Sequence, residues 1–218
     1  SSAASDVYKR QVGVRTPQLR KIARELCRRD DASDFMRSLP HVLFEENQVH
    51  ALVIGMEREY ERAVELYDLF LPHVGNWATC DQLPVRVLAE QPARTLECAR
   101  RWMSSEHGFT VRFGIGVLMR LFLDDLFEPR FAAMVAAARM SGSPERPEPE
   151  SDAYYVDMMR AWYFAEALVR QPMAAWPYVE RRDECALLDE WTRRKAIQKA
   201  CESRRISVEA KERLRSFR

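Results

Sequence analysis

The sequence predicts an all-α fold, built from successive pairs of amphipathic helices. From Thr16 onward, apolar residues recur at helical spacing almost without interruption. Prolines stand where one helical pattern stops and the next begins, as at Pro72, Pro92, Pro129 and Pro172, and proline is tolerated in the first turn of a helix but not in its interior. No run of alternating apolar and polar residues lies between turn residues, so we expect no sheet.

The expected helices follow one another with short connections. The first begins at Thr16-Pro17, with the Thr16 hydroxyl as N-cap and Pro17 at the first helical position, where its missing N–H costs nothing. The later helices are expected at residues 42–59, 61–72, 77–90, 92–105, 109–123, 128–140, 152–170, 172–181, 190–203 and 207–216. Successive pairs take up about 35–45 residues, which is the range of HEAT-like repeats. The predicted architecture is therefore a HEAT-like α-solenoid.

Two segments break this pattern. Residues 1–11 look foreign, because residues 6–11 resemble the translation of a transposase adapter used in sequencing libraries. We interpret them as a non-native scar that replaces the natural N-terminus, and we expect a single repeat domain over residues 12–218. Residues 141–153 are rich in proline, glycine and acidic side chains, so we expect an inserted flexible loop there.

Composition excludes several classes of protein. Hydrophobic residues make up 47% and charged residues 31%, as in ordinary soluble domains. No apolar run approaches the ~18–20 residues that cross a bilayer, and the five scattered cysteines suit reduced thiols in the cytosol. There is no glycine-rich phosphate loop, no nucleophile elbow, and no metal-ligand spacing among the four histidines. We therefore expect a cytoplasmic protein with no metal and no cofactor.

Basic residues gather at both ends of the chain. Residues 8–29 hold eight Lys or Arg and one Glu, residues 191–218 hold ten and three, and residues 30–190 hold sixteen basic and twenty-eight acidic residues. The ends are either solvated basic helices or surfaces that face a polyanion, and charge alone does not decide between these alternatives. If residues 1–11 are a scar, Lys9 and Arg10 do not belong in this tally.

Three further patterns are candidates for chemistry. Trp77 and Asp81 are four residues apart and share one helical face, so they are either a core tryptophan beside a solvent-facing acid or an aromatic and carboxylate site for a cation. Arg112 lies in an apolar helix start and needs a carboxylate partner or an external anion. Tyr155 and Trp162 share a face in an aromatic cluster that is mostly core, with a few members available to line a cleft.

The last basic segment, residues 191–207, reads as an amphipathic helix, a basic turn and a final helix that Ser207 caps. Such a helix is compatible with contacts to a nucleic-acid backbone but is not specific for them.

Taken in order, these segments resemble the AlkD-type DNA alkylation repair family. The motifs that carry the resemblance are Gly13-Val14-Arg15-Thr16-Pro17 with Arg20-Lys21, Asn76-Trp77 with Cys80-Asp81, Thr110-Val111-Arg112-Phe113, Tyr154-Tyr155-Val156 with Ala161-Trp162, and Ile197-Gln198-Lys199-Ala200. The resemblance implies a superhelical array with a concave basic face for duplex DNA. It also implies a monofunctional glycosylase in the bacterial cytosol that removes cationic N3- or N7-alkylpurines without flipping the nucleotide.

The resemblance assigns roles to individual residues. Asp81 is the catalytic carboxylate, Trp77 and Trp162 flank the deoxyribose, and Arg112 holds a phosphate beside the lesion. The residues expected to bind DNA are Arg112, Tyr155, Thr16, Arg20, Lys21, Arg193, Arg194 and Lys199. The expected partner is double-stranded DNA containing alkylated purines, bound by a monomer with no membrane association.

One departure from the family pattern concerns the second tryptophan. Active members carry an arginine three residues after it, and here that place is Ala165, followed by Glu166. The departure favours, as an alternative, a non-catalytic HEAT-like module that binds DNA or structured nucleic acid. A protein-interaction solenoid is a third alternative, since helical repeats commonly serve that purpose.

Overall fold

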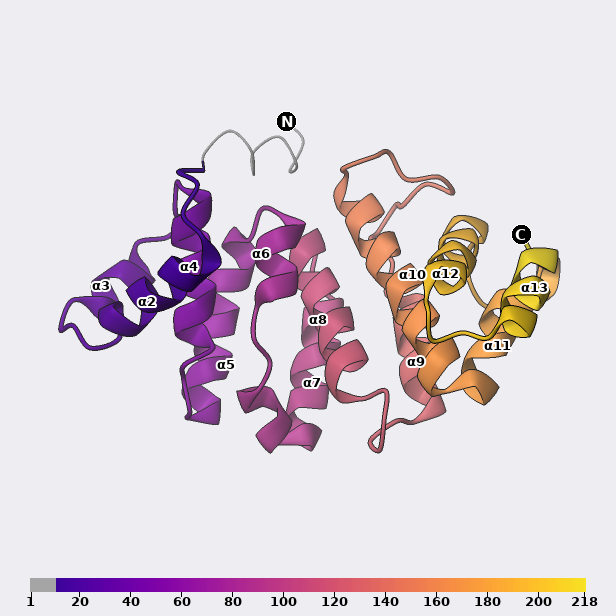
Figure 1. Ribbon diagram of the computed structural model, residues 1–218, viewed down its shortest axis with the longest axis horizontal. Helices are drawn as coiled ribbons and strands as arrows, with labels where there is room; N and C mark the ends of the chain where they lie inside the picture. The colour runs from indigo at the N-terminus through magenta and orange to yellow at the C-terminus, as the bar shows by residue number, and fades with distance from the viewer. Residues whose placement is uncertain (1–10) are drawn as a thin grey trace. The chain divides into compact units, whose positions relative to one another are not determined.

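The computed structural model describes residues 11–218, and every regular element in that range is helical (Figure 1). This confirms the predicted all-α class. The chain forms two compact units, unit 1 ending at Cys98 and unit 2 beginning at Ala99. The single repeat domain over residues 12–218 and the concave DNA-binding face stay predictions. Of the predicted scar, only Gln11 falls within the described residues.

Unit 1 is a series of short helices. They are α2 (Thr16–Leu26), α3 (Ala32–Arg37), α4 (Phe44–Ile54), α5 (Tyr60–Phe70), a 3-10 turn at Leu71–His73, α6 (Trp77–Gln82), a 3-10 turn at Val87–Glu90 and the first part of α7 (Pro92–Met103). Helix α2 packs on α4 through Leu19, Ala23 and Val49, which are all buried. This contact fixes the first helix pair.

Several expected boundaries in unit 1 are wrong. Thr16 is the first residue of α2, and its N-cap is Arg15, whose backbone is extended and whose N–H donates to Gln18 Oε1 at 3.3 Å. The helix expected over residues 77–90 stops at Gln82, because Leu83 precedes Pro84 and takes an extended ψ of 118°. A residue before proline is pushed out of the helical region by the proline ring.

Helix α4, expected to run to residue 59, ends at Ile54 and has Gly55 as its C-cap. Gly55 follows the last turn of α4, and a Cβ at that position would overlap the Pro84 ring. Glycine therefore allows the end of α4 and the segment after α6 to pack closely.

A buried carboxylate ties the chain before α2 to α4. Glu45, 7% exposed, accepts hydrogen bonds from the backbone N–H groups of Val12 at 2.9 Å and Gly13 at 2.7 Å. Gly13 has φ of +83°, a conformation that favours glycine, and this aims its N–H at the carboxylate. Burial raises the pKa of Glu45, but the backbone hydrogen bonds outweigh it and the pKa ends below its ordinary value.

Two histidines stack between phenylalanines in the interior of unit 1. His41 and His50 share a hydrogen bond of 2.8 Å between Nε2 and Nδ1. The His41 ring stacks on Phe35 at 4.5 Å, and the His50 ring stacks on Phe70 at 4.1 Å between centroids. Burial, followed by the nearby His41 and His73, lowers the pKa of His50 to about 3. His50 is therefore neutral at physiological pH.

Unit 2 is built around one long helix. It contains the last part of α7, α8 (Gly108–Leu121), α9 (Pro129–Ala137), α10 (Asp152–Arg170), α11 (Pro172–Glu180), a 3-10 turn at Asp183–Cys185, α12 (Glu190–Glu202) and α13 (Val208–Ser216). Helix α10 packs against both α8 and α12 (Figure 1). Its buried face carries Tyr163 and Phe164, neither of which is exposed.

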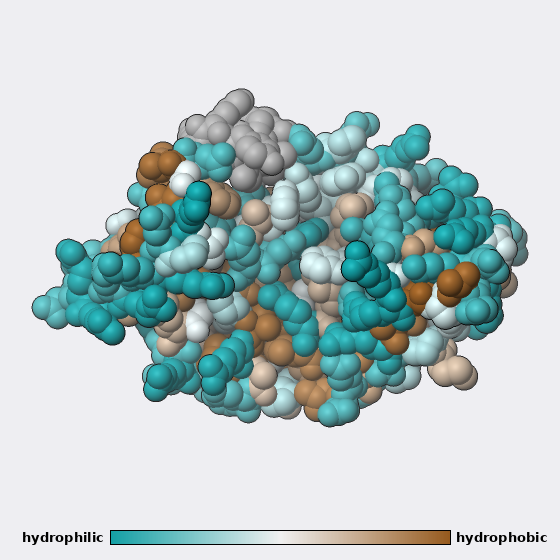
Figure 2. All heavy atoms as spheres, in the orientation of Figure 1, coloured by the Kyte–Doolittle hydropathy of each residue, from teal (hydrophilic) through white to brown (hydrophobic). Residues whose placement is uncertain are grey.

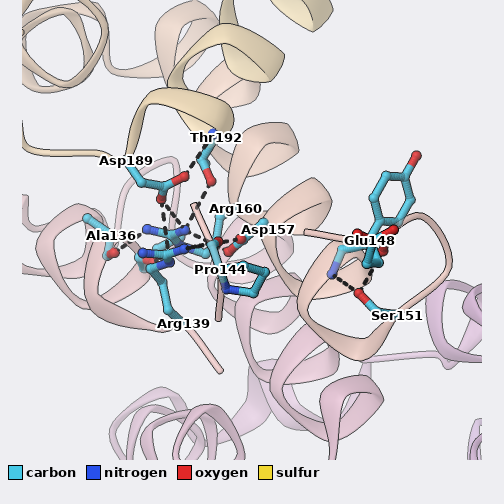
Figure 3. Close-up of polar contacts among 11 residues, drawn as sticks. Ala136, Arg139, Pro144, Glu148, Ser151, Asp157, Arg160, Asp189 and Thr192 are labelled. Atoms are coloured by element: carbon cyan, nitrogen blue, oxygen red, sulfur yellow. Dashed lines mark hydrogen bonds and ion pairs between the residues drawn. The ribbon is translucent and has the colours of Figure 1, made fainter. Parts of the chain in front are cut away.

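A buried ionic cluster joins α9, α10 and α12 (Figure 3). Arg160, 1% exposed, donates to Asp157 and Asp189 at 2.7 Å each and to the Thr192 hydroxyl at 3.0 Å. It also donates to the carbonyls of Val135 and Ala136 in the last turn of α9. The Val135 carbonyl also accepts from the N–H of Ala138, the C-cap of α9, at 3.2 Å. Arg160 therefore adds donors to the last turn of α9, where the regular helical hydrogen bonds run out.

The segment between α9 and α10 contains no regular helix and is fastened at both ends (Figure 3). Near its start, Arg139 donates to the Pro144 carbonyl at 3.0 Å. Near its end, the Ser151 hydroxyl donates to the Glu148 carbonyl at 2.7 Å and accepts from Tyr154 N–H at 3.1 Å. Ser151 is thus the N-cap of α10, so the loop expected over residues 141–153 ends at Ser151. Its flexibility stays a prediction.

Candidate functional site

The short helix α6 in unit 1 presents the Trp77 and Asp81 pair. Asn76 precedes the helix with an extended backbone, and its Oδ1 accepts a hydrogen bond of 2.8 Å from Thr79 N–H. This is an N-cap of the kind that asparagine favours. It places Trp77 at the first helical position and Asp81 one turn further on.

The other side of α6 is anchored in the core of unit 1. Thr79 and Cys80 are buried, and Gln48 of α4 donates from Nε2 to Thr79 Oγ1 at 2.9 Å. A buried side-chain hydrogen bond of this kind holds α6 at one rotation, because turning the helix would leave both groups unpaired. The orientation of Trp77 therefore depends on the cap and on this anchor.

Trp77 is 46% exposed, whereas Trp102 is 2% exposed and is a true core tryptophan. The interpretation of Trp77 as a core residue is therefore wrong. Asp81 is half-buried beside it on the same face. An indole ring attracts cations by about 0.5–2 kcal/mol, and a carboxylate attracts them by charge. The face of α6 is suited to a positively charged group.

In unit 2, Arg112 of α8 is 7% exposed and donates from Nη1 to the Tyr155 carbonyl at 2.7 Å. Sequence reasoning offered a carboxylate or an external anion as its partner, and this contact is with a backbone carbonyl. Tyr155 is itself 7% exposed, and its ring packs 5.2 Å from Phe109 and 5.6 Å from Tyr154. Burial is the main cause that raises the Tyr155 pKa. This placement favours the core interpretation of Tyr155.

Trp162 lies half-buried on α10, between buried neighbours. Ala165, which stands where the family pattern has an arginine, is 6% exposed. The next residue, Glu166, forms an ion pair with Arg205. No cation on α10 replaces the missing arginine at these two positions.

At the basic N-terminal end, Thr16, Arg20 and Lys21 are all exposed on α2, and hydrophilic residues cover the α2 and α3 region in Figure 2. Lys21 lies 3.8 Å from Glu25, in an exposed pair that contributes little energy. These three side chains are accessible to a large ligand.

The basic C-terminal helix α12 is different, because one of its predicted DNA contacts is buried. Arg193 is 2% exposed and donates to Glu190 at 2.9 Å, to the Val179 carbonyl at 3.2 Å and to the Phe217 carbonyl. It joins the ends of α11 and α13 to α12, so the DNA contact predicted for it is not supported. Arg194 is exposed and pairs with Glu190 at 2.9 Å, while Lys199 is half-buried.

Sequence reasoning missed the cluster around Arg160. A signal was present, since Asp157 and Arg160 are three residues apart within an aromatic helix, where charged side chains need partners. Asp157 is fully buried, and burial raises its pKa despite Arg160, whereas Asp189 has a lowered pKa because Arg160 and Thr192 outweigh its burial. The cluster serves packing in unit 2 rather than ligand contact.

Across residues 11–218, no helix combines the length and apolarity that a membrane span requires, and no three His, Cys, Asp or Glu side chains are grouped to hold a metal ion. Searches of curated proteins and of solved structures each found no match. The family model described as DNA alkylation repair enzyme matches residues 7–145, a span that includes the α6 pair and Arg112. That span is more than half of the chain, and the protein therefore belongs to the DNA alkylation repair enzyme family.

Proposed function

We propose that this protein is a monofunctional DNA glycosylase that excises cationic N3- or N7-alkylpurines from duplex DNA without flipping the nucleotide. The observation that carries the proposal is the exposed indole of Trp77 one helical turn from Asp81, on a helix fixed by Asn76 and Gln48. Family membership supplies the context of alkylation repair. An accessible aromatic and carboxylate face suits a reaction in which positive charge moves from a base to a sugar.

The proposed step breaks the bond between C1′ and the purine nitrogen. The cationic base takes both electrons of that bond and leaves as a neutral purine, so no general acid is needed. Positive charge then develops on the deoxyribose as an oxocarbenium ion, which the Asp81 carboxylate stabilises. Water adds at C1′ and loses its proton to Asp81 or to solvent, which leaves an abasic site. An open face suffices, because the base need not be enclosed, unlike in most enzymes that act on bases.

The face of α6 stabilises the positive charge on the sugar in the transition state more than the positive charge on the purine in the bound substrate. Before cleavage the positive charge is on the purine, and during cleavage it passes to the sugar. Trp77 attracts either cation through its ring, whereas Asp81 acts on charge that develops at the sugar. We therefore assign Asp81 to rate and Trp77 to positioning of the deoxyribose.

Residues of unit 2 carry separate proposed roles. Trp162 is assigned a contact to deoxyribose and Arg112 a contact to phosphate, both on the strength of the family pattern. The exposed cations Arg20, Lys21 and Arg194 are assigned to the DNA backbone, where each phosphate contact adds affinity that salt weakens. Arg193 has no part in this proposal.

The test is release of 7-methylguanine and 3-methyladenine from methylated duplex DNA, measured by chromatography of the free bases. Wild-type protein should release them, and Asp81→Asn should lower the single-turnover rate by at least about 100-fold, in line with the loss of one electrostatic stabiliser. Asp30→Asn, an exposed aspartate in the same unit, is the matched control and should excise like wild type. Equal rates for Asp81→Asn and wild type would remove Asp81 from the mechanism.

A second function, non-catalytic binding to structured nucleic acid, is favoured by the buried Ala165. It predicts salt-dependent DNA binding that Asp81→Asn leaves unchanged or strengthens, with no abasic product. Absence of base release by the wild type would reject the glycosylase and leave this alternative.

A further inference from the structure

A groove of about 740 Å³ lies on unit 2, between α12 and the proline-rich segment at residues 144–149. Its α12 side is formed by Trp191, Lys195 and Gln198, and its opposite side by Arg146. A second hollow of about 320 Å³ shares Arg146, Trp191 and Lys195 with it and adds Tyr154. Pockets of roughly 300–1,000 Å³ accept small organic ligands, so a nucleotide-sized molecule fits this space.

Trp191, which lines both hollows, carries a cation over its ring. The Lys195 ammonium stands 5.7 Å from the centroid of the Trp191 ring. Tyr154 contacts the same indole edge-on, with centroids 5.6 Å apart, and so braces it. A flat heterocycle that stacks on this face of Trp191 takes the place of the Lys195 ammonium over the ring. The displaced ammonium then lies close to any phosphate attached to the heterocycle.

Three cations around the groove carry no internal counter-charge. Within the described part of the chain, no carboxylate pairs with Arg146, Lys195 or Arg218. Arg194 differs, because it shares Glu190 with Arg193. The loop also contributes Glu145 and Glu148, so the excess of positive charge is small and suits one phosphate group rather than a dense polyanion.

The loop side of the groove is held in place by the contacts described above (Figure 3). Arg139 fixes the Pro144 carbonyl, and Ser151 fixes the Glu148 carbonyl, so hydrogen bonds flank the stretch that carries Arg146. Because this side of the groove is already ordered before a ligand binds, less conformational entropy is lost on binding.

We propose that this groove is a binding site for one unpaired nucleotide, with the base stacked on Trp191 and the phosphate at Lys195 and Arg146. Aromatic stacking combined with a positive groove is how proteins hold single-stranded nucleic acid without reading its sequence. The site goes beyond the proposed excision from duplex DNA and does not depend on it. The nucleotide comes either from a single strand or from a free mononucleotide.

The test is fluorescence anisotropy of the full chain with a labelled ten-nucleotide oligothymidylate, and with dTMP as competitor. Trp191→Leu should weaken oligothymidylate binding by about 5- to 150-fold, the range for loss of one stacked base. Lys195→Gln should reduce the slope of log affinity against log salt by about 0.7, as for one lost phosphate contact on a single strand. Trp176→Leu and Lys211→Gln, which alter unit 2 outside the groove, are the matched controls and should bind like wild type.

Circular dichroism melts establish that each variant is folded before its binding is compared. Competition by dTMP at the affinity of the oligonucleotide would assign the groove to free mononucleotides, and competition only by the oligonucleotide would assign it to a strand. Oligothymidylate binding that Trp191→Leu and Lys195→Gln leave unchanged would overturn the proposal. So would a wild-type protein that binds neither ligand. None of these readings uses base excision, so failure here is distinguishable from failure of the glycosylase proposal.

Discussion

Replacing Arg160 with methionine tests whether the buried cluster of unit 2 is held by charge. Methionine keeps most of the side-chain length and removes the guanidinium, which donates to two carboxylates, one hydroxyl and two carbonyls. The two carboxylates differ in how much solvent and how many other partners they keep when the guanidinium is removed. Asp189 is 14% exposed and keeps the Thr192 N–H at 3.0 Å, whereas Asp157 is fully buried and its nearest other cation is Arg139 at 3.8 Å.

The expected cost follows from this asymmetry. Removing one partner of a buried ion pair typically costs about 3–5 kcal/mol, because the remaining charge stays desolvated. Here one such charge, Asp157, is left, so Arg160→Met should lower the free energy of unfolding by about 3–5 kcal/mol. That is a large part of the roughly 5–15 kcal/mol that stabilises a folded protein. For a chain of this size the melting temperature should fall by about 6–20 °C.

The assay is urea unfolding followed by circular dichroism at two pH values. Loss of Arg160 removes the main cation that favours ionised Asp157, so the already raised pKa of Asp157 rises further in the folded variant. An acid with a raised folded pKa binds its proton more tightly when folded, so the variant should regain stability as the pH falls from 7.5 to 5. Asp157→Asn/Arg160→Met should be more stable than Arg160→Met at pH 7.5 and lack this recovery. A loss below about 1 kcal/mol for Arg160→Met, or a double variant no better than the single one, would refute the reasoning.

Three further predictions concern unit 1. Gly13→Ala should lose about 1 kcal/mol or more in urea unfolding, because alanine disfavours the φ of +83° that aims the Gly13 N–H at Glu45; an unchanged midpoint would contradict this. Asn76→Ala should lower the free energy of unfolding by about 0.5–2 kcal/mol, because it removes the N-cap of α6. It should also slow base excision, because Trp77 is then held less firmly. Asn76→Asp keeps a capping oxygen and should preserve both stability and excision. His50, with a folded pKa of about 3 against an ordinary value near 6.5, contributes stability that is complete above pH ~6.5. That contribution should be lost by up to about 1.4 kcal/mol per pH unit as the pH falls from 6.5 toward 3. In urea unfolding, His50→Phe should flatten the stability profile between pH 6.5 and 5, and a profile as steep as that of the wild type would contradict this.

Local patterns predicted much of the fold because several helix starts have a local physical cause. Helices α7, α9 and α11 begin at Pro92, Pro129 and Pro172, as expected from a residue with a fixed φ and no N–H. Helix α3 was missed, since none of its residues is buried and it therefore shows no apolar periodicity. The apolar residues after Pro84 continued the helical pattern of α6, and this periodicity concealed the break that the proline imposes.

The candidate site was less predictable, because burial depends on distant parts of the chain. Trp77 and Arg193 were both predicted to contact DNA, yet Trp77 is exposed and Arg193 is not. The carbonyls that receive Arg193 belong to Val179 and Phe217, at the ends of other helices. Only the packed structure of unit 2 brings such partners together, so a run of basic residues does not reveal which of its members is accessible.

We expect the attachment of the loop to the Arg160 cluster to link two parts of unit 2 in one cooperative folding unit. Arg139, which fixes the loop at Pro144, lies 3.8 Å from Asp157 and 3.7 Å from Asp189, the same carboxylates that hold Arg160. If the loop detaches at this end, the Arg139 guanidinium moves away from Asp157 and Asp189, the two carboxylates that tie α10 to the start of α12. We therefore expect the backbone amides near Arg139 to exchange with solvent through openings that also disturb the packing of α9, α10 and α12. An ordinary surface loop would instead exchange by local fraying that leaves its neighbours intact.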